Sequence, residues 1–167
     1  MRDNIMIALK GVAIVLLQVM VLNHIQLFGW CGIYFYIIFL LTLPNNIKPI
    51  PLLLIAALFG AAIDIFSGVY GMHTAITVLV AYLRPSVMSL FATKEQIEKG
   101  DPSYKDYNMA FYYYAGTLIF IHHILLYLLE AFTFNNIGLT LLKALSSFAI
   151  TMLALVLTQS IKQRSRS

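Results

Sequence analysis

The sequence predicts an all-α, polytopic membrane protein with six transmembrane helices. Of its 167 residues, 60% are hydrophobic and only 11% are charged, and the mean hydropathy is +0.84. A soluble domain carries about 25% charged residues. Long apolar stretches alternate with short polar turns, and each stretch approaches the ~20 residues that cross a bilayer as a helix. We therefore expect one integral membrane domain over residues 1–167.

Six apolar segments account for most of the chain. The predicted helices cover about residues 5–27, 27–43, 51–66, 72–91, 112–132 and 138–161. The second segment is the shortest: as a helix it spans about 25 Å against a hydrocarbon core of ~30 Å, so it is either untilted or partly re-entrant. Pro44 and Pro51 bracket the turn before the third segment, because helices tend to stop before proline. Arg84-Pro85 interrupts the fourth segment, where a kink is expected.

The only long polar stretch is the loop over residues 92–108. Thr93 followed by Gln96 has the spacing of a capping box, and Gly100 and Pro102 then act as a stop. This pattern predicts a surface helix of one or two turns. The run from Tyr112 to Tyr114 opens the fifth segment and is typical of an interfacial aromatic belt.

Lysine and arginine residues fall at alternate ends of the segments. Both termini, the Lys48 turn and the 92–108 loop carry them, whereas the turns near Phe28-Gly29, Gly68 and Asn135 carry none. Because cytoplasmic loops are enriched in these residues, we expect the N- and C-termini and the 92–108 loop to be cytoplasmic. The net charge of +4 comes mainly from these flanks and therefore indicates topology rather than nucleic-acid binding.

The third and fourth segments form a hairpin that carries an acid and a histidine. Asp64 and His73 lie about equally far from Gly68 on opposite arms, so they should reach similar depth. An intramembrane acid is costly and usually faces the bundle interior with a partner. Ala56 and Gly60 share the face of Asp64, and such small residues allow another helix to approach closely. That groove is filled either by this chain's own helices or by the membrane helix of a partner.

A second hairpin repeats this arrangement with opposite charges. Glu130 and Lys143 are placed symmetrically about the turn at Asn135-Asn136, so both should lie near Asp64 and His73 in the outer half of the membrane. The four groups form either two local pairs that neutralise each other or one polar cluster that lines a cavity or receives a partner helix.

A proton or ion path is a weaker alternative. It needs polar groups through both leaflets, whereas the inner half offers only Lys10 and Arg84 at its edge. A small channel meets the same objection. Gln18, in the middle of the first segment, is expected to hydrogen-bond an adjacent helix.

The residue patterns predict neither a metal site nor an active site. Adjacent helical residues point about 100° apart, so His122 and His123 cannot chelate one ion together, and about 10 Å of helix separates His123 from Glu130. We expect neutral histidines bonded to a neighbouring helix. Cys31 is the only cysteine, which excludes an intrachain disulfide. Without a nucleophile–base pair, paired carboxylates or a phosphate loop, we expect no enzyme and no cofactor.

The pattern around the first hairpin resembles the rod-shape-determining protein MreD family. The matching residues are Gly60-x-x-x-Asp64-x-x-Ser67-Gly68-x-x-Gly71-x-His73, followed by Ala81-Tyr82-Leu83-Arg84-Pro85. The chain length and the order of apolar segments also resemble that family from end to end. The runs Asn23-His24-Ile25-Gln26 and His122-His123…Glu130 look like one branch of it.

The resemblance implies a non-enzymatic scaffold in the bacterial inner membrane. Proteins of that family act in cell elongation and are required for rod shape and lateral cell-wall synthesis through binding of MreC, which has a single membrane helix. The cytoplasmic actin-like MreB, the RodA glycosyltransferase and a penicillin-binding transpeptidase belong to the same machinery. The implied partners are thus proteins and the lipid bilayer, with no nucleic acid.

The family's fold also resembles the substrate-binding subunits of energy-coupling-factor transporters. This supplies an alternative function, a vitamin-type small-molecule binding subunit of a membrane transporter. Such a role requires an outward-opening cavity with several convergent polar groups.

Overall fold

The computed structural model describes residues 2–25, 31–132 and 136–164 and is an all-α bundle. The elements are α1 (Arg2–Met20), η1 (Leu22–His24), α2 (Phe35–Leu41), α3 (Pro49–Ser67), α4 (Met72–Phe91), α5 (Lys94–Lys99), α6 (Tyr104–Tyr107), α7 (Met109–Ala131) and α8 (Ile137–Arg164). Within these ranges, five helices are long and apolar enough to cross a membrane: Ile5–His24, α3, α4, α7 and α8. The chain is therefore a multi-pass membrane protein.

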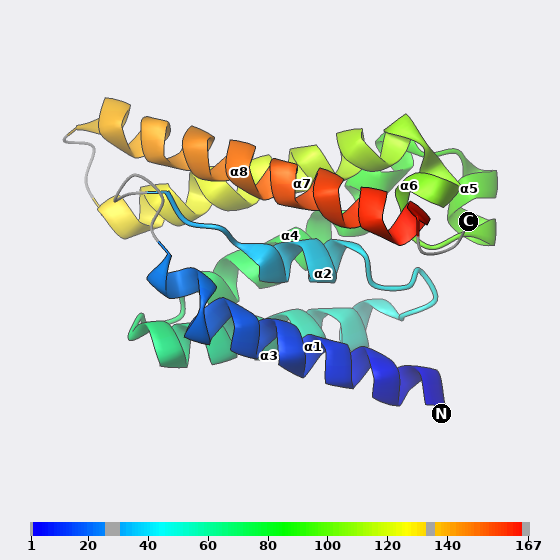
Figure 1. Cartoon of the computed structure of the whole chain (residues 1–167), viewed down its shortest axis with the longest axis horizontal. Helices are drawn as coiled ribbons and strands as arrows, with labels where there is room; N and C mark the ends of the chain where they lie inside the picture. The colour runs from blue at the N-terminus through cyan, green and yellow to red at the C-terminus, as the bar shows by residue number, and fades with distance from the viewer. Residues whose placement is uncertain (1, 26–30, 133–135, 165–167) are drawn as a thin grey trace.

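Successive long helices pack antiparallel, and α2 lies in the middle of the bundle. The helices α3, α4, α7 and α8 pack pairwise in that order, α1 packs on α2 and α3, and α2 contacts α1, α4, α7 and α8. Both termini lie at the same end as α5 and α6, which we call the loop end (Figure 1). The opposite end holds η1, the α3–α4 turn, and the residues Phe132 and Asn136 that flank the connection from α7 to α8. We call it the turn end.

The second predicted segment is not a continuous helix. Residues 26–30 lie outside the described part of the chain, residues 32–34 are not helical, and α2 has only seven residues. The stretch 31–43 nevertheless returns across the bundle, and in Figure 1 it lies between α1 and α3 on one side and α7 and α8 on the other. Extended and helical residues together carry it about 25 Å. Non-helical backbone is tolerated at membrane depth where protein buries it, and Cys31, Tyr36 and Leu41 are almost completely buried.

Side chains of α8 hydrogen-bond the backbone before α2. The Gly32 N–H donates to Ser147 Oγ over 3.1 Å, and the Tyr34 N–H donates to Thr151 Oγ1 over 3.4 Å. Ser147 and Thr151 are both completely buried and lie on one face of α8. They supply acceptors that a continuous helix would have found in its own backbone.

Gln18 of α1 serves the same stretch from the other side. Its Oε1 accepts from the Phe35 N–H over 2.7 Å, and its Nε2 donates to the Ile33 carbonyl over 2.8 Å. The amide of one buried side chain thus satisfies a donor and an acceptor at the start of α2. Gln18 was expected to bond a neighbouring helix; it bonds the first residue of α2 and also the non-helical backbone before it.

The long helices differ from their predicted bounds only at the ends. The helix α4 has the predicted bounds, and it continues through Pro85 rather than being interrupted there. The helix α3 begins at Pro49, because a proline in the first turn lacks only an N–H that would be unpaired anyway. The helix α7 begins before Tyr112, so Tyr114 lies deeper than predicted and is completely buried, while Tyr113 is exposed.

The polar loop forms two short helices. The capping box of Thr93 and Gln96 starts α5 as predicted. A second helix, α6, was not predicted; it begins after Ser103, whose Oγ accepts from the Asp106 N–H. The Asn45 side chain donates to the carbonyls of Ile97 and Gly100 over 3.1 and 2.9 Å, which ties the turn before α3 to this loop.

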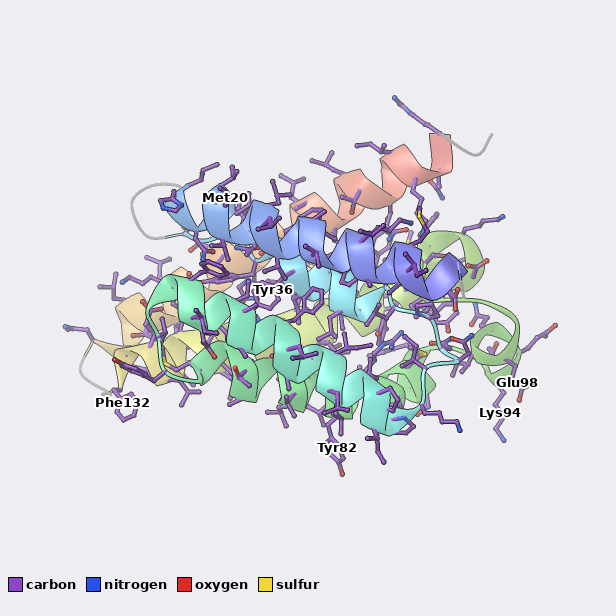
Figure 2. The ribbon with its side chains drawn as sticks, turned by 90° about the horizontal axis from the view of Figure 1, so that it is seen from below. Met20, Tyr36, Tyr82, Lys94, Glu98 and Phe132 are labelled. Carbon is purple, nitrogen blue, oxygen red and sulfur yellow. The ribbon has the colours of Figure 1, made fainter. Side chains whose placement is uncertain are left out.

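Large apolar side chains cover the outside of the bundle as well as its core. Tyr36 lies inside, whereas Tyr82 and Phe132 point away from it (Figure 2). The apolar span that contains α1 is the least buried of the five, with 17% of its most apolar window buried. Apolar residues on both faces are typical of helices that contact lipid as well as protein.

Candidate functional site

Asp64 is buried against the first turn of α4. Its side chain is 6% exposed, and Oδ1 accepts from the His73 backbone N–H and the His73 ring Nδ1, each over 2.9 Å. Oδ2 accepts from the Thr74 N–H over 3.0 Å and from the Thr74 hydroxyl over 2.6 Å. The N-terminus of a helix presents unpaired N–H groups and a partial positive charge, so α4 stabilises this carboxylate.

Two glycines shape the turn that brings Asp64 to α4. Gly68 ends α3 with φ of 67°, and Gly71 precedes α4 with φ of 74°. Side chains with a Cβ rarely adopt this left-handed conformation. The turn therefore needs both glycines to return the chain directly onto the last residues of α3.

The small-residue groove on α3 is filled by α4. A Cβ on Gly60 would overlap the backbone of Thr74, and Ala56 is completely buried. The Thr77 hydroxyl lies 3.1 Å from the Ala56 carbonyl. Of the two alternatives for this groove, the structure thus has the internal one, because Gly60 and Ala56 allow α4 to approach α3 too closely for another helix to enter.

A polar cavity of about 460 Å³ lies at the turn end of the bundle. The cavity is lined by residues from α1, η1 and the stretch before α2, and by residues from both helices of each hairpin (α3 and α4, α7 and α8). Its polar lining includes Gln18, Asn23, Tyr34, His73, Tyr127, Glu130 and Lys143. This volume is within the ~300–1,000 Å³ typical of small-molecule sites.

Three of the four groups predicted to lie together line this cavity. His73, Glu130 and Lys143 line it. Asp64 does not, but it accepts a hydrogen bond from the His73 ring. The local pair of Asp64 with His73 is present. The second local pair that one of the two alternatives gave, Glu130 with Lys143, is not present: in the described residues no ion pair joins these two side chains. Both side chains line one cavity, with Glu130 exposed and Lys143 half-buried.

Tyr34, which lines the cavity, lies at the centre of a group of aromatic rings. Its ring centroid lies 5.2–6.4 Å from those of five other rings: Tyr36, His73, His122, His123 and Tyr127. Sequence reasoning missed Tyr34 and Tyr36. The short second segment could have indicated them. A span too short to cross as a full helix leaves polar backbone groups, and these must be buried among side chains such as Tyr34 and Tyr36.

His122 and His123 point toward different neighbours. His123 Nδ1 donates to the Ile119 carbonyl over 2.8 Å, so Nε2 is the acceptor for the Thr151 hydroxyl at 3.1 Å. His122 Nε2 lies 2.6 Å from the Tyr36 hydroxyl. No group of metal ligands forms among the residues that the structure describes. The two histidines hold α7 to α8 and to α2.

Arg84 lies at the loop end and does not belong to the cavity. It is almost completely buried, its Nε donates to the Tyr114 hydroxyl over 2.9 Å, and its guanidinium donates to the Leu43 carbonyl. The Tyr114 hydroxyl donates to the Leu41 carbonyl over 3.0 Å. Leu41 is the last residue of α2 and Leu43 follows it, so both carbonyls lie at the C-terminus of that helix, whose partial negative charge favours a cation. Arg84, with Pro85 beside it, therefore fixes the end of α2.

The site can hold a polar molecule, and it offers charges of both signs beside aromatic rings. Comparison of the chain with protein-family models, with curated proteins and with solved structures finds no match.

Proposed function

We propose that this chain is a non-enzymatic scaffold of the bacterial cell-elongation complex, bound in the inner membrane to an MreC-like protein with one membrane helix. The observation that carries this proposal is the role of the MreD-like pattern in the α3–α4 hairpin. Gly60 permits close packing, Asp64 caps α4, and Gly68 and Gly71 shape the turn. These residues serve shape rather than chemistry, as expected of a protein that presents a rigid surface.

The hairpin presents apolar side chains at its tip. Ile65, Phe66 and Tyr70 are exposed, and Tyr70 is fully exposed beside the turn that Gly68 and Gly71 shape. A fixed turn with exposed aromatic residues suits the docking of a partner, because little conformational freedom is lost on binding. In this proposal the termini and the 92–108 loop are cytoplasmic, next to MreB and the cytoplasmic ends of RodA and the transpeptidase.

Co-purification tests the scaffold role. The chain and an MreC-like protein from the same genome are co-expressed, extracted in mild detergent and purified through a tag on the chain. We expect the partner to co-purify, and expect Phe66→Ala combined with Tyr70→Ala to lose it. Phe132→Ala is the matched control, because Phe132 is an equally exposed aromatic residue at the turn end on the other hairpin. If the wild-type chain does not retain the partner, the proposed scaffold role is wrong. If the double variant retains the partner fully, the hairpin tip is not the docking site.

The cavity favours the alternative function, a small-molecule binding subunit of a membrane transporter. It has the convergent polar groups that this role requires. Equilibrium binding of labelled vitamins to the purified chain tests it: saturable binding that Glu130→Gln weakens supports the alternative, and an absence of saturable binding rejects it.

A further inference from the structure

The cavity at the turn end offers one group of each charge. Asp64 already accepts four hydrogen bonds, and the Nδ1 of His73 is committed to it. Glu130 on α7 and Lys143 on α8 line the same cavity without an ion pair between them in the described residues. Two opposite charges that share a cavity but do not neutralise each other suit a ligand that itself carries both charges.

The aromatic rings distinguish the two ends of such a ligand. Tyr34 and Tyr127 both line the cavity, with ring centroids 6.4 Å apart and planes at 80° to each other. Glu130 lies three residues after Tyr127, on the same side of α7. A carboxylate beside aromatic faces is the usual environment for an ammonium group, which both the negative charge and the ring faces attract. Lys143 lies on the neighbouring helix α8, and its ammonium group is suited to bind the anionic end of the same ligand.

The position of the cavity indicates which anion. It lies at an end of the bundle, where the helices that it joins turn around, and in a bilayer that level is occupied by lipid headgroups and water. Phosphate is the abundant anion there, and a lysine ammonium is a common partner for phosphate. The volume of about 460 Å³ accommodates a headgroup-sized molecule with bound water.

We propose that this cavity binds a small zwitterion in which an ammonium group and a phosphate lie a few bonds apart, with Glu130, Tyr34 and Tyr127 around the ammonium and Lys143 on the phosphate. Ethanolamine phosphate has this chemistry, either as a free solute or as the headgroup of a zwitterionic phospholipid. The inference stands on the cavity alone. Binding of a zwitterion depends neither on the scaffold role nor on the transport role. The co-purification experiment tests the scaffold role separately.

Calorimetric titration of the purified full-length chain in detergent with O-phosphoethanolamine tests this proposal. We expect saturable binding that is about tenfold or more tighter than that of ethanolamine or glycerol 3-phosphate, since each of these lacks one charged contact. Glu130→Gln and Lys143→Met should each weaken binding by about tenfold or more, for the same reason. The matched controls are Glu98→Gln and Lys94→Met, which make the same chemical changes on exposed residues at the loop end (Figure 2) and should leave affinity unchanged.

Lipid nanodiscs distinguish the two sources of the ligand. If phosphatidylethanolamine discs block the binding of free O-phosphoethanolamine and phosphatidylglycerol discs do not, the lipid headgroup occupies the cavity. If free ligand binds equally in both, the ligand is a solute; either result supports the shared chemistry. The proposal is wrong if no saturable binding occurs in detergent or in phosphatidylglycerol discs, or if the cavity variants behave as the controls do. It is also wrong if γ-aminobutyrate, with a carboxylate in place of the phosphate, binds as tightly.

Discussion

Asp64 shows how one buried carboxylate can hold two helices together. Each of its oxygens accepts two hydrogen bonds from the first turn of α4, so the charge is balanced by donors rather than by a basic side chain. His73 is one of those donors and need not be charged, because a neutral ring with a proton on Nδ1 makes the same contact. The pairing expected from the sequence is present, but backbone N–H groups supply half of it.

Asparagine should replace Asp64 better than leucine does. Asp64→Asn keeps one oxygen acceptor, whereas Asp64→Leu leaves all four donors without a partner, and each buried donor left unpaired costs about 1–3 kcal/mol. We expect the leucine variant to lose several times more thermal stability in detergent than the asparagine variant. Melting temperature and purified yield measure the difference. If the two variants were equally stable, the hydrogen bonds of Asp64 would contribute nothing to the fold.

Gly60 in α3 and Gly116 in α7 provide a matched pair of substitutions. A Cβ on Gly60 would overlap the backbone of Thr74, whereas a Cβ on Gly116 would meet the flexible end of Met152 at 3.5 Å. Gly60→Ala should destabilise the chain by about 1–3 kcal/mol through overpacking. Gly116→Ala should be neutral or stabilise it by up to about 1 kcal/mol, because alanine favours the helix. Thermal unfolding of both variants gives the sign. If Gly60→Ala left the stability unchanged, α4 would not pack as closely against Gly60 of α3 as the structure shows.

Among the elements, the stretch 31–43 depends most on its neighbours. Its non-helical part borrows hydrogen bonds from Gln18 on α1 and from Ser147 and Thr151 on α8. A helix carries its own backbone hydrogen bonds, so it forms wherever its sequence is apolar enough. An extended stretch at the same depth forms only where other segments place polar side chains beside it. The element and its two supporting helices therefore depend on one another.

Replacement of Gln18 tests this dependence. Gln18→Leu should lower stability by about 2 kcal/mol or more, because the Phe35 N–H and the Ile33 carbonyl lose their buried partner. Hydrogen exchange of the Phe35 amide should accelerate more than exchange in the middle of α4. Met20→Leu, on an exposed position of the same helix, is the control and should change neither quantity. An unchanged Phe35 exchange rate in Gln18→Leu would contradict the role given to Gln18.

The two ends of the bundle differ in charge. The loop end gathers both termini, α5 and α6, together with Lys94 and Lys105 (Figure 1). The turn end has the polar cavity, and the turns there carry no lysine or arginine. The distribution of these residues favours a cytoplasmic loop end, so the cavity would face the opposite side of the membrane.

Cysteine labelling tests the topology. In a Cys31→Ser background, a cysteine introduced by Asn136→Cys should react with a membrane-impermeant maleimide added to intact cells. A cysteine introduced by Glu98→Cys should react only after the cells are lysed. Glu98 and Asn136 are both exposed on the bundle, so burial does not limit either reaction. Reaction of both cysteines from outside would overturn the predicted orientation.

The properties that follow from local composition can be predicted from the amino-acid sequence. Hydropathy and segment length predict an all-α membrane protein, the spacing around Gly68 places Asp64 opposite His73, and Thr93 with Gln96 predicts the start of α5. Each of these depends on residues within one segment or one turn of the chain, at most about 20 positions apart. Local patterns are sufficient there because helix formation and capping involve near neighbours in the chain.

The way in which distant segments share their polar groups depends on three-dimensional packing. Glu130 and Lys143 were expected either as a local pair or as part of a cluster on a cavity; they share a cavity, and five other segments complete its wall. Arg84, which lies between apolar residues in the sequence, donates to the Leu43 carbonyl just after α2. The second segment is only partly helical because Gln18 and Thr151, more than 100 residues apart, meet at its backbone. In a bilayer, buried polar groups must find partners, and which partners they find depends on packing that no local pattern encodes.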